Sequence, residues 1–233
     1  MKKLLLIIAV AATGLTGASA QIFKTINSTE MVNGYMNVFE LDGTSFVFGS
    51  NWGISDLNST YNSASSLTMS PNTIGDPATP FWYIPAGAPG SLGQKVMEGN
   101  LYGEQTGTYA GQIVTFAGNV SSFSLATNSA GIPYAVTAFI RDFAGDFSSF
   151  TTSTAPITGT GEFAIALATI NDPTRKVQWG LQIKGPNIWG TDTAQLGVAG
   201  SATIDAVPEP STYALLALGA AGFGAHLIRR RRR

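Results

Sequence analysis

Between residues 21 and 206 the apolar side chains recur with the two-residue period of a β-strand, not with the 3.6-residue period of a helix. The clearest case is residues 177–184, where every second side chain is apolar and shares one face. These four are Val177, Trp179, Leu181 and Ile183. No stretch of the region sustains a helical period, so the sequence predicts an all-β fold with Trp179 in its core.

Eight further segments have strand character and are separated by turn residues. They are residues 35–41, 45–49, 96–102, 109–117, 120–126, 135–140, 162–168 and 198–205, with turns at 42–43, 128–131, 171–173 and 185–187. About nine short strands with Gly, Pro, Asn and Asp between them predict an antiparallel β-sandwich with a jelly-roll-like topology. Residues 51–93 break this rhythm because they are rich in Ser, Asn, Thr, Gly and Pro, so we expect long loops there.

The chain opens with the features of a secretory signal peptide. Lys2 and Lys3 precede an apolar stretch at residues 4–12, and the small residues at 18–20 suit signal peptidase. We therefore expect residues 1–20 to be removed and the mature chain to begin outside the cytoplasm. That compartment permits disulfide bonds, yet the sequence contains no cysteine. The single domain expected at residues 21–206 must therefore be held by packing alone.

The tail at residues 207–233 combines three features that direct a chain to a membrane. The first is a proline-stiffened, extended signal made of Val207, Pro208, Glu209 and Pro210. The second is an apolar segment at residues 213–228, about 24 Å long as a helix, which predicts one C-terminal transmembrane helix. The third is a basic anchor made of Arg229, Arg230, Arg231, Arg232 and Arg233. By the positive-inside rule the anchor stays cytoplasmic, which places the ectodomain across the membrane.

In this order, and together with the signal peptide, the tail resembles the PEP-CTERM proteins of bacteria. The resemblance covers residues 207–233 and the signal peptide, and nothing between them. It implies export, an inner-membrane precursor, recognition of residues 207–210 by an exosortase, and removal of the tail. It also implies release or attachment at the cell surface or in the extracellular matrix, commonly alongside exopolysaccharide or biofilm production.

The charge distribution narrows the range of partners. The whole chain has a formal net charge of −1, but residues 21–206 contain six basic and thirteen acidic residues, a formal net charge of −7. An acidic domain of this kind repels the phosphate backbone, so nucleic acid is not an expected partner.

The ectodomain also lacks the side chains of most hydrolytic sites. It has neither Cys nor His, because the one histidine, His226, lies in the tail. Ser-His-Asp and Cys-His catalysis and the usual zinc sites are therefore excluded. Asp142 with Asp146, or Glu40 with Asp42, would be the carboxylate pair of a glycosidase. We interpret them instead as turn residues or ligands of a structural calcium ion, although no EF-hand motif is present. We expect no enzyme and no cofactor.

Carbohydrate binding is the favoured function. Sugars stack their C–H faces on aromatic rings and bond their hydroxyls to amides and carboxylates. The residues predicted to form such a platform are Trp52, Trp82, Tyr83 and Trp189, with Asn51 and Asn187 beside them. The strands at 178–182 and 198–204, with the nearby Trp189, are loosely similar to jelly-roll carbohydrate-binding modules. Loop aromatics at 81–83 that cap the core are the alternative. A purely structural surface protein and a carboxylate-dependent glycosidase are the alternative functions.

Overall fold

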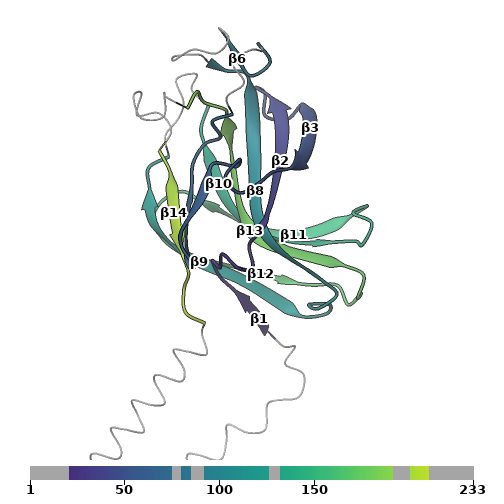
Figure 1. Cartoon of the computed structure of the whole chain (residues 1–233). Coiled ribbons are helices and arrows are strands. Elements are labelled where there is room, and N and C mark those ends of the chain that lie inside the picture. Colours follow the sequence, from purple (N-terminus) through teal and green to yellow (C-terminus); the bar gives the residue numbers. More distant parts are fainter. Residues whose placement is uncertain (1–20, 75–79, 85–91, 126–131, 191–199, 210–233) are drawn as a thin grey trace, which may run out of the picture.

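The computed structural model describes residues 21–74, 80–84, 92–125, 132–190 and 200–209. Within these residues the chain forms fourteen β-strands and no helix, so the predicted all-β fold is confirmed (Figure 1). The strands are β1 (Gln21–Lys24), β2 (Asn33–Glu40), β3 (Phe46–Asn51), β4 (Ser59–Ser63), β5 (Ser66–Met69), β6 (Tyr83–Ile84), β7 (Leu92–Gly93), β8 (Lys95–Thr106), β9 (Ile113–Phe123), β10 (Ala135–Phe143), β11 (Phe150–Ile157), β12 (Gly161–Ala168), β13 (Lys176–Pro186) and β14 (Ala202–Asp205).

Twelve of these strands form two six-stranded sheets. Sheet A has the order β1-β9-β14-β5-β4, and β12 pairs with the other edge of β9. Sheet B has the order β11-β10-β13-β8-β2-β3, while β6 and β7 form a small separate pair. Among the described strands every pairing is antiparallel except that of β1 with β9, which is parallel.

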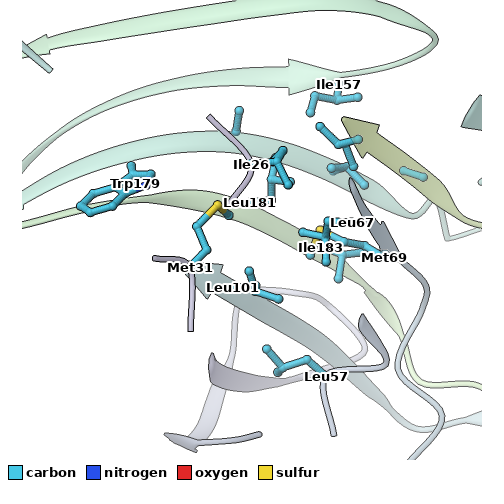
Figure 2. Close-up of a cluster of buried hydrophobic side chains, with 14 of the residues drawn as sticks. Ile26, Met31, Leu57, Leu67, Met69, Leu101, Ile157, Trp179, Leu181 and Ile183 are labelled. Atoms are coloured by element: carbon cyan, nitrogen blue, oxygen red, sulfur yellow. The ribbon is translucent and has the colours of Figure 1, made fainter. Parts of the chain in front are cut away.

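The inward faces of the two sheets share one hydrophobic core. Figure 2 shows Leu67 and Met69 from β5 of sheet A beside Ile183 from β13 of sheet B, and all three side chains are buried. The alternation read at residues 177–184 is confirmed, because Val177, Trp179, Leu181 and Ile183 are all in the core. Contact between side chains of two facing sheets is what removes their apolar surface from water and holds a cysteine-free domain together.

A glycine on β8 makes room for the largest core side chain. Trp179 is opposite Gly103 in the pairing of β13 with β8, and its exposed fraction is 1%. A Cβ atom on Gly103 would lie 2.4 Å from Cζ2 of the Trp179 ring. The indole therefore packs directly against the backbone of β8, in a space that a side chain at position 103 would fill.

The strand predictions are wrong in four places. Residues 51–93, predicted to be long loops, contain the β4–β5 hairpin of sheet A and the short strand β6. The two strands predicted at 109–117 and 120–126 are one strand, β9, preceded by a turn at 109–112. Residues 185 and 186, predicted to lie in a turn, continue β13, and β11 was not predicted at all.

The last strand before the tail is central to sheet A. β14 lies between β9 and β5, and the described chain then runs on through Val207 to Glu209. The backbone N–H of Val207 donates to the hydroxyl of Thr25 at 3.0 Å, so the segments after β1 and after β14 meet at the same end of the domain (Figure 1). No helix of the described residues is long and apolar enough to cross a membrane. The predicted segment at 213–228 lies outside those residues.

Candidate functional site: a cleft on the outer face of sheet B

The outer face of sheet B carries a cleft of about 530 Å³, which we call the outer cleft. Its walls come from five neighbouring strands and the turn after β10. The lining residues are Tyr35 and Asn37 of β2, Asn51 of β3, Asn100, Tyr102 and Glu104 of β8, Arg141 and Phe143 of β10, Gln178 of β13, and Phe147 of the turn. A volume of this size is in the range of small-molecule and oligosaccharide sites.

Strand register explains why these residues gather. Arg141, Gln178 and Glu104 are opposite one another across β10, β13 and β8. Two residues further along, Phe139, Gly180 and Tyr102 form the next outward-facing row, followed by Gln182, Asn100 and Tyr35. Side chains of directly opposed residues point to the same face of a sheet. Gly180 has no side chain, and a Cβ atom there would overlap the backbone of Leu101 and Tyr102, so β13 and β8 approach closely in the middle row.

Asn100 is the central hydrogen-bonding residue of the cleft floor, and its exposed fraction is only 1%. Its Oδ1 accepts hydrogen bonds from Arg141 Nη1 at 3.1 Å and from Gln182 Nε2 at 2.9 Å. Its Nδ2 donates to the carbonyl of Glu98 at 3.1 Å. A buried amide with both ends engaged has a fixed orientation, so it holds the Arg141 and Gln182 side chains in place before a ligand arrives.

Two carboxylates contribute acceptors at different points of this face. Glu104 Oε2 accepts from Gln178 Nε2 at 2.7 Å. Glu98 Oε1 accepts from Asn37 Nδ2 at 3.0 Å, and Glu98 Oε2 pairs with Lys184 Nζ at 3.1 Å. Both glutamates are on β8, six residues apart, which corresponds to roughly 20 Å along a strand. Glycosidase carboxylates are about 5–9.5 Å apart, so this pair has the wrong spacing for glycoside hydrolysis.

Four aromatic rings border the cleft: Tyr35, Tyr102, Phe143 and Phe147. The Phe147 side chain is half-exposed, and its φ of 60° is in the left-handed region that a bulky residue rarely adopts. Burial raises the pKa of the Tyr102 hydroxyl, and the nearby carboxylate of Glu104 raises it further. Tyr102 is therefore a neutral hydroxyl and ring at physiological pH.

Arg141 is the cation of the cleft floor. Its guanidinium carbon lies 3.9 Å from the centroid of the Phe139 ring, whose exposed fraction is 0%. Burial lowers the pKa of Arg141, and the negative charge of Glu98 acts in the opposite direction. The side chain stays charged, but it has lost part of its hydration.

The four aromatics predicted as a carbohydrate platform do not form one exposed surface. Trp82 and Tyr83 have exposed fractions of 9% and 0%, and both are in the core. The Tyr83 hydroxyl donates to the carbonyls of Ile74 and Ile188. Trp189 is partly buried, and its ring is edge-on to that of Tyr83, with 5.1 Å between the ring centroids. Trp52 is partly buried and lines a second cleft of about 560 Å³ together with Asn51, which also lines the outer cleft.

The two amides predicted beside that platform, Asn51 and Asn187, also lie in different surroundings. Asn51 is exposed and lines the outer cleft. Asn187 has an exposed fraction of 2% and is used internally, because its Nδ2 donates to the Trp82 carbonyl at 2.9 Å and its Oδ1 accepts from the Lys95 N–H at 3.1 Å.

The candidate catalytic carboxylates have structural partners. Asp142 is fully buried, pairs with Arg175 Nε at 2.8 Å and accepts the Ile170 N–H at 2.8 Å. Asp146 and Asp42 accept hydrogen bonds within their own turns, and Glu40 pairs with Lys95 at 3.0 Å. Within the described residues no cluster of three or more potential ligands could hold a metal ion.

Comparison with known proteins identifies the tail. Residues 206–232 match the PEP-CTERM protein-sorting motif, so the resemblance drawn from the signal at residues 207–210 is confirmed. The chain therefore carries the sorting motif of secreted proteins of this class. Of that signal, Val207, Pro208 and Glu209 are described residues; Pro210 and the basic anchor at 229–233 lie outside them.

No curated protein matches the chain in sequence. Two solved structures are similar at a distance. A carbohydrate-binding module of the β-sandwich superfamily is 10% identical over 75% of this chain and 84% of its own, with a TM-score of 0.32. The N-terminal CBM22-1 and GH10 modules of Clostridium thermocellum endo-1,4-β-D-xylanase 10B, complexed with xylohexaose, are 8% identical over 78% of this chain and 29% of their own, with a TM-score of 0.29. Scores this low do not define a ligand or a site in this chain.

Proposed function

We propose that this protein is exported, sorted by an exosortase, and binds a carbohydrate at the cell surface or in the extracellular matrix without catalysing a reaction. The binding site is the outer cleft. The ligand is a surface polysaccharide of the organism that makes the protein.

The observation that carries the binding proposal is the combination of rings and prearranged polar groups in one cleft. Tyr102, Phe143 and Phe147 offer ring faces and edges, while Glu104, Gln178 and Arg141 offer polar groups, and the buried Asn100 holds Arg141 in place. Rings that stack on sugar C–H groups, beside amides and carboxylates that bond hydroxyls, are what a carbohydrate site requires.

The backbone of Phe147 supports the same proposal. A φ of 60° costs a non-glycine residue about 1–2 kcal/mol, and the ring is nevertheless half-exposed. Its contacts are the Phe143 ring at 5.4 Å and Lys176 Nζ at 4.2 Å. Backbone strain in a residue that gains little burial is typical of a position kept for binding.

The sorting proposal rests on the motif at residues 206–232. We infer that an exosortase in the membrane recognises residues 207–210, that residues 213–228 span the membrane in the precursor, and that residues 229–233 anchor the cytoplasmic side. Residues 1–20 are the export signal and residues 21–206 the mature domain. Exopolysaccharide or biofilm matrix is the surrounding in which such a domain would bind.

Affinity electrophoresis of residues 21–209 through gels containing the organism's own exopolysaccharide tests the binding proposal. We expect retardation of the wild type, and a loss of at least about tenfold in affinity for Tyr102→Ala and Phe147→Gly. Phe147→Gly is informative because relief of the strained φ offsets the lost contacts, so the free energy of unfolding should stay within about 1 kcal/mol.

Phe46→Ala is the matched control, because Phe46 is an exposed aromatic of β3 that does not line the cleft. Trp52→Ala and Trp189→Ala test the platform predicted from the sequence. A loss of affinity in these variants, with none in Tyr102→Ala and Phe147→Gly, would show that the binding site is not the outer cleft. Unretarded migration of the wild type would favour the structural alternative. Release of reducing sugar by the wild type would favour the glycosidase.

Replacement of Pro208 and Pro210 by alanine tests the sorting proposal. The precursor should then accumulate in the membrane fraction with its tail attached, while the wild type is processed. Equal processing of both would contradict recognition of this signal.

A further inference from the structure

The basic residues of the domain divide into two groups. Four of the six form ion pairs with carboxylates: Lys24 with Glu30 at 3.0 Å, Lys95 with Glu40 at 3.0 Å, Arg175 with Asp142 at 2.8 Å and Lys184 with Glu98 at 3.1 Å. Within the described residues, Arg141 and Lys176 have no carboxylate within ion-pair distance.

Both of these cations are at the outer cleft. Arg141 lines its floor. Lys176 is opposite Phe143 in the pairing of β13 with β10, and its Nζ lies 4.2 Å from the centroid of the Phe147 ring; both rings line the cleft. At the outer cleft these two cations outnumber the one carboxylate among the described lining residues, Glu104, which forms no ion pair with another described residue. In a domain with more than twice as many acidic as basic residues, this local excess of positive charge favours an anionic ligand.

The surroundings of Arg141 leave part of its binding capacity unused. Of its five N–H donors, one bonds to Asn100 Oδ1, and one face of the guanidinium covers the Phe139 ring. A guanidinium that has lost hydration without gaining an anion is incompletely compensated. A carboxylate arriving from solvent would accept two of the remaining donors in the planar, bidentate geometry that arginine favours.

The carboxylates of this face do not supply that anion. Glu98 is already paired with Lys184 and bonded to Asn37, and Glu104 accepts from the neutral amide of Gln178 and forms no ion pair with Arg141. Arg141 and Lys176 are on adjacent rows, but their side chains point apart, because Arg141 contacts Phe139 and Asn100 while Lys176 contacts Phe147. Two separated cations suit a polymer in which anionic groups recur along the chain.

We propose that the outer cleft binds an acidic polysaccharide, with Arg141 bonding a carboxylate of one sugar and Lys176 meeting a second anionic group further along the same chain. This inference rests on the proposed carbohydrate binding and names the class of sugar. The rings and amides contact the neutral parts of the chain, and the two cations select for its charged substituents.

Isothermal titration calorimetry with matched polymers tests the inference. The probes are a polyuronate, the same polymer with its carboxylates reduced to hydroxymethyl groups, and a sulfated neutral glycan of similar length. We expect the polyuronate to bind at least about tenfold more tightly than its reduced form. Affinity should fall as salt rises, because salt screens exposed charge. Tighter binding of the sulfated glycan than of the polyuronate would overturn the assignment to carboxylates.

Substitutions of the two cations separate the contribution of their charges to binding from effects on the stability of the fold. Arg141→Gln and Lys176→Gln should each lose about tenfold or more for the polyuronate and clearly less than that for the reduced polymer. Lys24→Gln is the control, because Lys24 is ion-paired away from the cleft, and it should bind both polymers as the wild type does. Lys176→Gln keeps the test valid if the Arg141 variant fails to fold.

The outcomes distinguish this inference from the proposed function. Equal affinity of the wild type for both forms of the polymer, unchanged by Arg141→Gln, would overturn the acidic-sugar inference and leave carbohydrate binding intact. Failure of the wild type to bind any of the polymers or the native exopolysaccharide would overturn both.

Discussion

Asp142 shows how the surroundings of one side chain decide its role. The carboxylate is adjacent in sequence to a residue that lines the cleft, but strand alternation turns it to the opposite face, where it is buried against Arg175. Arg175 also donates through Nη2 to the Asp142 carbonyl at 2.6 Å. Both charges are therefore satisfied internally, and neither is available to a substrate.

We predict that Asp142→Ala lowers the free energy of unfolding by about 3–5 kcal/mol, because it leaves the Arg175 guanidinium buried without its partner. Urea unfolding measures the change. Asp146→Ala removes an exposed turn carboxylate four residues away and should cost less than about 1 kcal/mol. The double variant with Arg175→Met should recover part of the loss. An Asp142→Ala change no larger than that of Asp146→Ala would contradict the structural role.

The residues of the candidate site were only partly predictable. Alternation predicted Trp179 correctly. At residues 81–82 a turn leads into β6, and Phe81 is exposed while Trp82 and Tyr83 are both buried. The residues of the cleft were visible as polar and aromatic side chains on the outward positions of β2, β8 and β10. A solvated strand face has the same pattern, and only the register between strands brings those positions into one cleft.

At the level of strands, the sequence was informative where one face of a strand is apolar and the other is polar. β2, β8, β10, β12 and β13 were predicted within a few residues of their bounds, apart from the length of β8. β4 and β11, with the sequences Ser-Thr-Tyr-Asn-Ser and Phe-Thr-Thr-Ser-Thr-Ala-Pro-Ile, were missed. Both are edge strands of their sheets, and an edge strand buries less, so it carries little apolar alternation.

The contact between β13 and β8 gives a prediction at this scale. Gly103→Ala should lower the free energy of unfolding by about 1–3 kcal/mol, because the new methyl group overlaps the Trp179 ring and forces it out of position. Urea unfolding and near-ultraviolet circular dichroism would follow the change. Gly159→Ala is the matched control, since a Cβ there meets nothing within 4 Å. Equal stability of the two variants would show that β8 tolerates a side chain under the indole.

The turn between β2 and β3 should lose stability in acid. Hydrogen bonds from the Ser45 hydroxyl, and from the backbone N–H groups of Ser45 and Thr44, lower the pKa of Asp42 from 3.8 to about 2. Because the folded-state pKa is below the unfolded one, this carboxylate stabilises the fold above about pH 4. The contribution is lost as the pH falls to about 2.

Side-chain NMR titration of Asp42 measures its pKa directly. Urea unfolding at pH 5 and pH 2, compared between the wild type and Asp42→Asn, isolates its contribution from the other turn aspartates, Asp146 and Asp172, whose pKa values are also lowered. The wild type should lose more stability than the variant across this window. A titration near pH 4 would show that the turn does not favour the charged form.

For the whole molecule, the prediction concerns the strand next to the tail. A chain of residues 21–200 should fail to unfold cooperatively, because it lacks Ala202 and Ile204 of the core and leaves β5 and β9 without the strand between them. A chain of residues 21–209 should keep the fold, since β14 ends at Asp205. Thermal unfolding followed by circular dichroism compares them. Cooperative unfolding of the shorter chain would mean that β14 is dispensable.

The central position of β14 also decides how the domain would carry load. If the processed protein is held at the surface by its C-terminal end, the anchoring force acts lengthwise along β14. The opposing force, from a polymer bound in the outer cleft, acts on sheet B on the other side of the core. Hydrogen bonds to β9 and β5 lie across that pull, so they resist it together, whereas an edge strand would peel away one bond at a time. Pulling single molecules from residue 209 should therefore need more force than pulling from β4, and the reverse order would show that the tail end is the weak point.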